Sequence, residues 1–188
     1  MKALRITLAG LVMSLTSFYA QADNEDRDGL LLGIALGSSS INTSVDLVSD
    51  PNDTASSSDS RGTAVSLRFG GGLGNKSAMY LLTQTAATEN ELGHSLTGLG
   101  ASYYFNKNGA SLYLMGGFGY GLVSYAESEK PEGTGTAAMA GIGLELGMGL
   151  SVELNHMRVR TEPENDSINP SGIYNIASTQ FLVGFTWF

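Results

Sequence analysis

The sequence has 188 residues, 25 glycines and no cysteine, and 10 Lys and Arg against 18 Asp and Glu give a formal net charge of −8. The length fits one domain, and the missing cysteines exclude disulfide scaffolds, thiolate metal sites and cysteine nucleophiles. Two histidines leave little for a histidine-rich metal centre, and the acidic balance argues against a nucleic-acid partner. We therefore expect no metal and no cofactor.

Residues 1–22 read as a cleavable signal peptide. Lys2 and Arg5 form a positive start, Ile6–Phe18 is mostly apolar, and Ala20-Gln21-Ala22 is a small-residue cleavage site. A membrane anchor is the alternative, but the apolar stretch is short and interrupted by Ser and Thr. We expect export and a mature domain of residues 23–188.

The mature sequence shows the period of two that is typical of β-strands. In six segments large apolar residues alternate with mostly small ones: Leu30–Gly37, Thr63–Gly70, Gly98–Phe105, Leu112–Leu122, Ala138–Gly147 and Phe181–Trp187. Two further segments, about Ser77–Ala86 and Leu150–Arg160, are predicted strands whose phase the sequence leaves open. The sequence therefore predicts eight strands.

The connections between these strands alternate in length. Long polar ones are expected at about Ser38–Ser60, Ala87–His94, Ala126–Gly135 and Thr161–Ala177, and short ones near Gly71–Lys76, Asn106–Ala110 and Gly147–Gly149. A meander with long loops at one end and short turns at the other is typical of outer-membrane barrels. A soluble sandwich has no reason to sort its loops in this way.

The two faces of the strands favour a membrane barrel over a soluble one. A soluble barrel turns its large apolar set inward, whereas here the opposite set is largely Gly, Ala and Ser, which suits a narrow lumen. We expect the lumen to hold a polar, ion-paired network that serves stability, formed by Arg68, Gln84, Glu145 and Glu153. Aromatic residues near strand ends are predicted to form a girdle at the membrane interface: Phe69, Tyr103, Phe105, Tyr120, Phe185 and Trp187.

The chain ends Phe181-Leu182-Val183-Gly184-Phe185-Thr186-Trp187-Phe188. This ending resembles the C-terminal insertion signal of Gram-negative outer-membrane barrels, and the whole mature chain is similar to the small OmpA/OmpX-type barrels. The resemblance implies an all-β, eight-stranded antiparallel transmembrane up-and-down barrel in the outer membrane, with both termini periplasmic. It also implies a monomer in contact with lipid and lipopolysaccharide, and an assembly machinery that reads the last strand and Phe188. Thr186 departs from the pattern, because an aromatic residue often occupies that place.

Arg158 and Arg160 share one face of a strand just below the fourth long connection. Two interpretations stay open for them. They contact lipopolysaccharide phosphates, which arginine binds well, or they are a solvated strand end.

The histidines give no clear catalytic pattern. Some small outer-membrane barrels are lipid A deacylases that carry His and Ser two residues apart on one strand face, but Arg158 stands two residues after His156. His94 and Ser95 are adjacent, so they point to opposite faces; we expect both histidines to be exposed. The favoured function is a non-enzymatic structural or surface-interaction role through acidic extracellular loops that meet a host or extracellular ligand. A lipid-modifying enzyme and a narrow pore are the alternatives.

Overall fold

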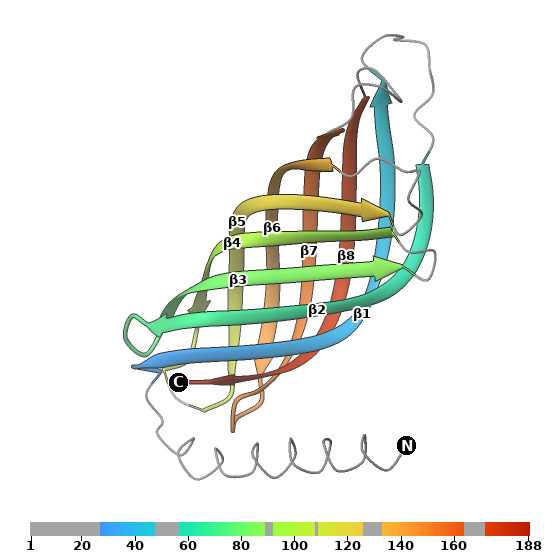
Figure 1. Ribbon diagram of the computed structural model, residues 1–188. Helices are drawn as coiled ribbons and strands as arrows, with labels where there is room; N and C mark the ends of the chain where they lie inside the picture. Colours follow the sequence, from blue (N-terminus) through green and yellow to red (C-terminus); the bar gives the residue numbers. More distant parts are fainter. Residues whose placement is uncertain (1–26, 48–56, 89–91, 108, 126–132, 164–171) are drawn as a thin grey trace, which may run out of the picture.

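The computed structural model describes residues 27–47, 57–88, 92–107, 109–125, 133–163 and 172–188, so the predicted signal peptide lies outside the described residues. The predicted architecture is confirmed: eight antiparallel strands pair in chain order and β1 closes the barrel against β8 (Figure 1). The strands are β1 (Leu30–Leu47), β2 (Ser57–Gly72), β3 (Ser77–Thr88), β4 (Leu92–Tyr104), β5 (Ser111–Tyr125), β6 (Gly133–Glu145), β7 (Leu150–Pro163) and β8 (Gly172–Trp187). The described residues include no helix that is long and apolar enough to cross a membrane.

The register gives the barrel its tilt. One row of cross-strand partners starts at Trp187 on β8 and returns to β8 at Ala177, ten residues away, by way of Leu32, Phe69, Leu81, Leu99, Phe118, Ala138 and Arg158. A shear of ten over eight strands corresponds to a strand tilt of about 40°. Rows of partners therefore climb along the axis from β1 to β8.

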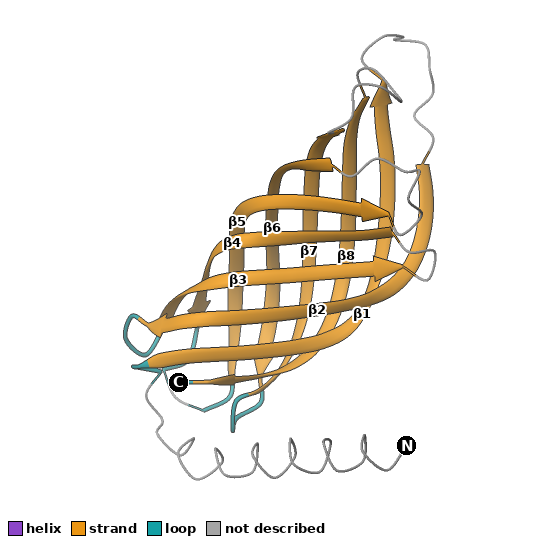
Figure 2. Cartoon of the chain, viewed as in Figure 1, coloured by secondary structure: helices purple, strands orange, loops and turns teal. Residues whose placement is uncertain are grey.

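Three tight connections, residues 73–76, 105–110 and 146–149, lie at the end of the barrel where β1 begins and β8 ends, which we call the turn end (Figure 2). In the last of them Leu146 N donates to Leu150 O at 2.8 Å, and Gly147 and Gly149 have φ of 93° and 76°. Glycine adopts such positive φ values without steric cost, which explains two glycines in one turn. We call the opposite end the loop end.

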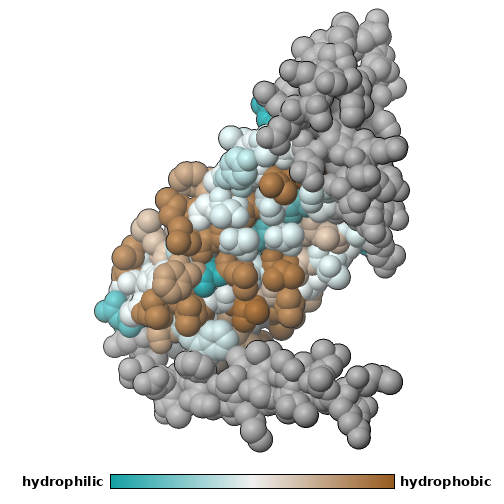
Figure 3. All heavy atoms as spheres, in the orientation of Figure 1, coloured by the Kyte–Doolittle hydropathy of each residue, from teal (hydrophilic) through white to brown (hydrophobic). Residues whose placement is uncertain are grey.

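All eight strands carry exposed apolar side chains in the half of the barrel nearer the turn end, where they form a belt. Figure 3 shows this belt on one face. The alternation predicted for six strands is confirmed, with Leu30, Leu32, Ile34 and Leu36 outward on β1. The structure also gives the phase of the other two strands. Leu81 on β3 and Leu154 on β7 face outward, whereas Gln84 and Glu153 face the lumen. From the strand spacing and tilt the belt is about 20 Å tall, close to the ~25 Å band of membrane barrels.

The strands continue toward the loop end beyond the belt. β1 reaches Leu47 and β2 starts at Ser57, so the connection expected at Ser38–Ser60 is largely strand, and the expected connections 87–94, 126–135 and 161–177 are shortened in the same way. The predicted boundaries were wrong because they relied on apolar alternation. Above the belt the outward residues are polar, for example Ser38, Ser40 and Thr63, all of which are exposed.

The outer face of the barrel changes from apolar to polar along the axis, and the lumen becomes less polar in the same direction. Within the belt the outer face is apolar, and the lumen holds charged and hydroxyl-bearing side chains together with buried apolar ones such as Leu31, Leu82 and Leu182. Beyond the belt the outer face is rich in Ser, Thr and Arg, whereas the lumen is mainly apolar. Six lumenal side chains in this part are at most 2% exposed: Ile41, Leu96, Val123, Met157, Val159 and Ile176. The section near the loop end is thus built like a soluble barrel, and the section below it like a membrane barrel.

Candidate functional site

The centre of the lumen is a buried ion pair between Arg68 on β2 and Glu153 on β7. Arg68 Nη1 donates to Glu153 Oε1 at 2.7 Å, and Arg68 Nη2 donates to Glu153 Oε2. The two side chains are 6% and 1% exposed. Tyr113 Oη donates to the same carboxylate at 2.6 Å, and the Tyr80 ring lies 5.7 Å from the guanidinium carbon. Both charges are therefore paired and hydrogen-bonded, the condition under which buried charges are tolerated.

Glycines on neighbouring strands make room for this cluster. A Cβ on Gly143 would lie 2.2 Å from the Tyr113 ring, and a Cβ on Gly100 would lie 2.3 Å from the Tyr80 ring. The small lumenal residues thus accommodate the long side chains that reach across from other strands.

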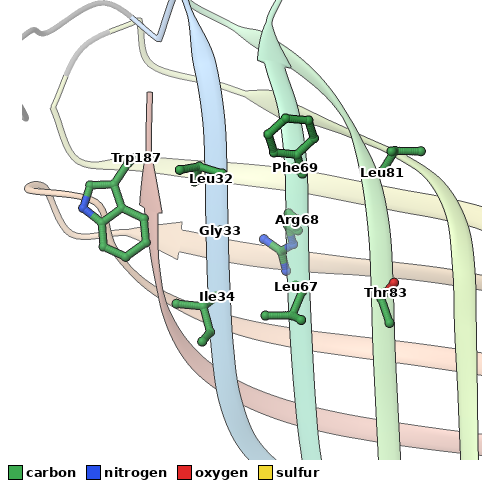
Figure 4. A pocket seen from close by; sticks show the side chains of 9 residues that line it. All are labelled: Leu32, Gly33, Ile34, Leu67, Arg68, Phe69, Leu81, Thr83 and Trp187. Atoms are coloured by element: carbon green, nitrogen blue, oxygen red, sulfur yellow. The ribbon is translucent and has the colours of Figure 1, made fainter. Parts of the chain in front are cut away.

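On the outer face of the barrel, Figure 4 shows Leu32, Phe69 and Leu81 in a row beside Trp187, where they line a shallow groove of about 300 Å³.

Glu145 does not join this pair. Its carboxylate accepts from Arg27 Nε at 3.2 Å, at the turn end of the lumen. The predicted single network is therefore two separate ion pairs. Glu145 is the last residue of β6 and lies at the turn end of the lumen, whereas Glu153 lies farther along the axis toward the loop end. Gln84, the fourth predicted lumenal residue, is fully buried and donates from Nε2 to Gln180 Oε1 at 2.6 Å.

Arg27, just before β1, donates hydrogen bonds to two connections at the turn end, residues 73–76 and 105–110. Its guanidinium donates to the carbonyl oxygens of Asn106 at 2.9 Å, Lys107 at 2.7 Å and Gly109 at 2.8 Å, and lies 4.3 Å from the Tyr104 ring centroid. The ring of Phe188 packs against Tyr104 with centroids 6.0 Å apart. Sequence reasoning missed Arg27; the available signal is a lone basic residue among acidic ones directly ahead of the first strand.

His94 is 1% exposed inside the barrel, so the expectation of an exposed His94 was wrong. Its Nε2 lies 2.9 Å from Ser178 Oγ, which also accepts from Gln180 Nε2 at 3.0 Å. Nδ1 of His94 has no hydrogen-bond partner among the described residues, so no carboxylate orients the ring as nucleophilic catalysis requires. His156 is exposed on the outer face of β7, 3.2 Å from Thr179 Oγ1. The described residues also bring no three His, Asp or Glu side chains together as a metal site.

The predicted girdle residues all point outward. Phe69, Tyr103, Phe105 and Tyr120 are exposed, and Phe185 and Trp187 are partly exposed. Tyr103 and Phe105 meet edge to face at 5.7 Å, and Phe185 and Trp187 stack at 5.9 Å. The register places all of them except Tyr120 in the part of the belt nearer the turn end. Thr186 faces the lumen, which accounts for the polar residue in the last strand.

Arg158 and Arg160 are exposed on the outer face of β7, just beyond the apolar belt. With Phe118 on β5 and Thr136 and Ala138 on β6, they line a surface groove of about 420 Å³. Of the ion pairs between described residues, Arg27–Glu145 and Arg68–Glu153, both lie in the lumen.

A closed eight-stranded antiparallel barrel with an apolar outer belt and ion pairs inside is the fold of a small Gram-negative outer-membrane β-barrel, and the belt is a surface for lipid. Solved structures of three such proteins are similar to this chain. Ail of Yersinia pestis, in complex with the heparin analogue sucrose octasulfate, is 13% identical with a TM-score of 0.53, and the match covers 85% of this chain and 99% of that chain. OprG of Pseudomonas aeruginosa is 11% identical with a TM-score of 0.51, and the match covers 86% of this chain and 97% of that chain. Neisserial surface protein A is 9% identical with a TM-score of 0.50, and the match covers 82% of this chain and 96% of that chain. No protein-family model and no curated protein matches the sequence.

Proposed function

We propose that the protein is a non-enzymatic barrel of the bacterial outer membrane that presents its loop end to the outside as an interaction surface. In this proposal residues 1–22 are removed during export, the turn end and both termini face the periplasm, and the barrel acts as a monomer. The assembly machinery reads the last strand, including Phe188. The observation that carries the proposal is the apolar belt, which leaves the polar-walled section and the loops beyond it outside the lipid.

The charge of the loop end favours a cationic partner. Twelve acidic residues fall in or next to the sequence connections of the loop end, against the four basic residues Arg61, Lys130, Arg158 and Arg160: Asp46, Asp50, Asp53, Asp59, Glu89, Glu91, Glu127, Glu129, Glu132, Glu162, Glu164 and Asp166. Ail was solved with a heparin analogue, which is an anion. The acidic loops of this chain instead suit a basic host surface or divalent cations, because complementary charge guides association.

The test is binding of cells that display the protein to a basic surface such as a polylysine-coated layer or cultured host cells. A variant with Glu127, Glu129 and Glu132 replaced by Gln removes three charges from one loop, and Lys130→Gln in the same loop is the control of opposite sign. We expect the triple variant to bind less well and Lys130→Gln to bind at least as well as the wild type. Equal binding by all three would contradict the proposed surface role.

The lumen gives no support to the lipid-modifying alternative. His94 and Ser178 are both 1% exposed, and the lumenal side chains above them are buried as well, so a lipid has no approach to this pair. We expect lipid A from cells with and without the protein to have the same acyl chains by mass spectrometry. Loss of an acyl chain that depends on Ser178 would restore the enzymatic alternative.

A further inference from the structure

His94 places a titratable ring inside the loop-end section of the barrel, where the lumen is mainly apolar. The ring is 1% exposed, and its strand partners on β3 and β5, Ala86 and Val123, are buried as well. Across the barrel on β8, Ser178 Oγ lies 2.9 Å from Nε2 of the ring. Nδ1 is buried and has no hydrogen-bond partner among the described residues. The ring is thus enclosed by buried side chains with one polar contact.

A protonated His94 would have two N–H donors for a single acceptor. Ser178 Oγ can accept from Nε2, although it already accepts from Gln180 Nε2 at 3.0 Å. The second donor, Nδ1–H, would be buried with nothing to accept it among the described side chains. A neutral ring lacks one hydrogen bond at this place, whereas a charged ring would also lose its hydration. The closed section therefore favours the neutral ring.

No counter-charge faces the ring in the described part of the lumen. Level with the ring and beyond it, the described lumenal side chains of the other seven strands are Gly, Ala, Val, Ile, Ser and Thr, none of which titrates near neutral pH. The nearest described lumenal charges, Arg68 and Glu153, are paired with each other and lie about 15 Å closer to the turn end. The imidazolium would thus be a buried and uncompensated charge.

The charged residues on the outside of this section do not offer an anion either. Arg61, Arg158 and Arg160 are exposed on the outer face and are cations like the protonated ring. The remaining titratable side chains next to this section lie outside the described ones: Asp46, Asp59, Glu89, Glu91, Tyr125, Glu162 and Tyr174. A carboxylate among them that reached the ring would reverse the expected pH dependence, which makes this dependence the decisive measurement.

The loop-end section can respond to such a charge because lipid does not hold it. It lies beyond the apolar belt, and packing of buried side chains such as Leu96 and Ile176 keeps water from the ring. We propose that His94 is an acid-sensitive switch, whose protonation opens the lumenal packing of the loop-end section while the belt stays closed in the membrane. The section that opens is the one that carries the loops.

The direction and size of the effect follow from proton linkage. The open form takes up a proton near the ordinary histidine pKa of about 6.5, and the closed form does not. The equilibrium constant for opening therefore rises about tenfold for each pH unit below that value. The inference relies on the proposed orientation only for the source of acid, since the loop end then meets the medium. The measurement itself is independent of the orientation and of what the loops bind.

Hydrogen exchange of the folded chain in phospholipid nanodiscs, followed by NMR at about pH 7.5 and about pH 5, measures the opening. Dividing each rate by the intrinsic exchange rate at the same pH leaves the contribution of opening alone. The reporters are the backbone amides of residues 94–96 and 176–178, and those of residues 99–103 in the belt are the reference. His94→Gln keeps a donor for Ser178 and cannot be charged. His156→Gln is the matched control, because it removes the other histidine of the chain, which is exposed.

We expect the reporter amides of the wild type to lose about 30-fold in protection between about pH 7.5 and about pH 5, and the belt amides to change less than about twofold. His156→Gln should behave like the wild type. His94→Gln should keep its protection within about twofold over the same range. A gel shift on heating confirms that each variant is folded.

Three results would overturn the proposal. One is equal protection of the wild-type reporter amides at the two pH values. Another is an equal loss in His94→Gln, which would assign the acid response to carboxylates of the loops. The third is higher protection at the lower pH, which would reveal an acidic partner of the ring. If His94→Gln does not fold, NMR of the wild-type imidazole decides, because a ring that is charged in the closed barrel at about pH 5.5 contradicts the switch.

Discussion

Arg68 and Glu153 form a bidentate ion pair although their strands, β2 and β7, do not pair with each other. The shorter way around the barrel between them passes through β1 and β8. The pair therefore bridges the two strands that flank the β1–β8 closure of the barrel.

Removal of Arg68 leaves the Glu153 carboxylate buried without its counter-charge. We expect Arg68→Ala to lower the free energy of unfolding by about 3–5 kcal/mol. The measurement is urea unfolding in lipid vesicles, followed by the fluorescence of Trp187, the single tryptophan of the chain. Arg61→Ala, an exposed arginine on the same strand, should change the free energy by less than about 0.5 kcal/mol. Equal stability of the two variants would show that the lumenal pair contributes nothing.

Arg27 links the turn end to Glu145 through charge-assisted hydrogen bonds. We expect Arg27→Ala to lower the free energy of unfolding by about 2 kcal/mol, since its loss leaves a buried carboxylate and several carbonyl groups without a donor. Lys107→Ala is the control, because it removes an exposed side chain and keeps the carbonyl that accepts from Arg27. The assignment fails if the Lys107 variant is as unstable as the Arg27 variant.

Gly143 is required by packing. A Cβ at this position would overlap the Tyr113 ring, whose hydroxyl donates to Glu153. We expect Gly143→Ala to destabilise the barrel by about 1–3 kcal/mol, as overpacking of a tight interior does. At Gly116 on β5 the nearest atom to an added Cβ is 3.7 Å away, so Gly116→Ala should be nearly neutral. Equal tolerance at both positions in the same unfolding assay would contradict this packing.

The filled lumen predicts that the barrel does not conduct. The Arg68–Glu153 pair closes the belt section, and buried aliphatic side chains such as Ile41 and Ile176 fill the section above it. We expect no steady channel openings of the wild type in planar lipid bilayers. Regular openings that respond to Arg68→Ala would show a water path through the centre and would support the pore alternative.

The sequence was sufficient for the strands and their faces where one face meets lipid. Alternation at Leu30–Leu36 or Phe181–Trp187 follows directly from an apolar outer face, and the alternation of their own strands placed Arg68 and Glu145 in the lumen. Gln84 and Glu153 were also expected there, but they lie on the two strands whose phase came only from the structure. Alternation fails beyond the belt, where Ser38 and Ser40 face outward and Ile41 faces inward. There the sequence resembled a loop, because the outward-facing residues beyond the belt are polar and no longer show the apolar alternation.

Partners in the lumen were beyond sequence reasoning. Which carboxylate meets Arg68 depends on the shear of ten residues, which only the closed register fixes. Arg27 lies ahead of the first strand, where strand periodicity carries no information. His94 was expected on the surface, yet the alternation of Gly98–Phe105, continued back along β4, directs it inward to Ser178.

The central claim is that the belt spans the outer membrane with the loop end outside, and single cysteine substitutions test it most directly because the chain has no cysteine of its own. Ser40→Cys probes the wall near the loop end, Leu81→Cys the belt, and Leu73→Cys the turn end, all at exposed positions. In intact cells we predict that a membrane-impermeant maleimide labels Ser40→Cys alone. Leu73→Cys should react only after the outer membrane is permeabilised, and Leu81→Cys should stay protected by lipid. Labelling of Leu73→Cys but not Ser40→Cys in intact cells, or labelling of all three in a soluble periplasmic fraction, would contradict the claim.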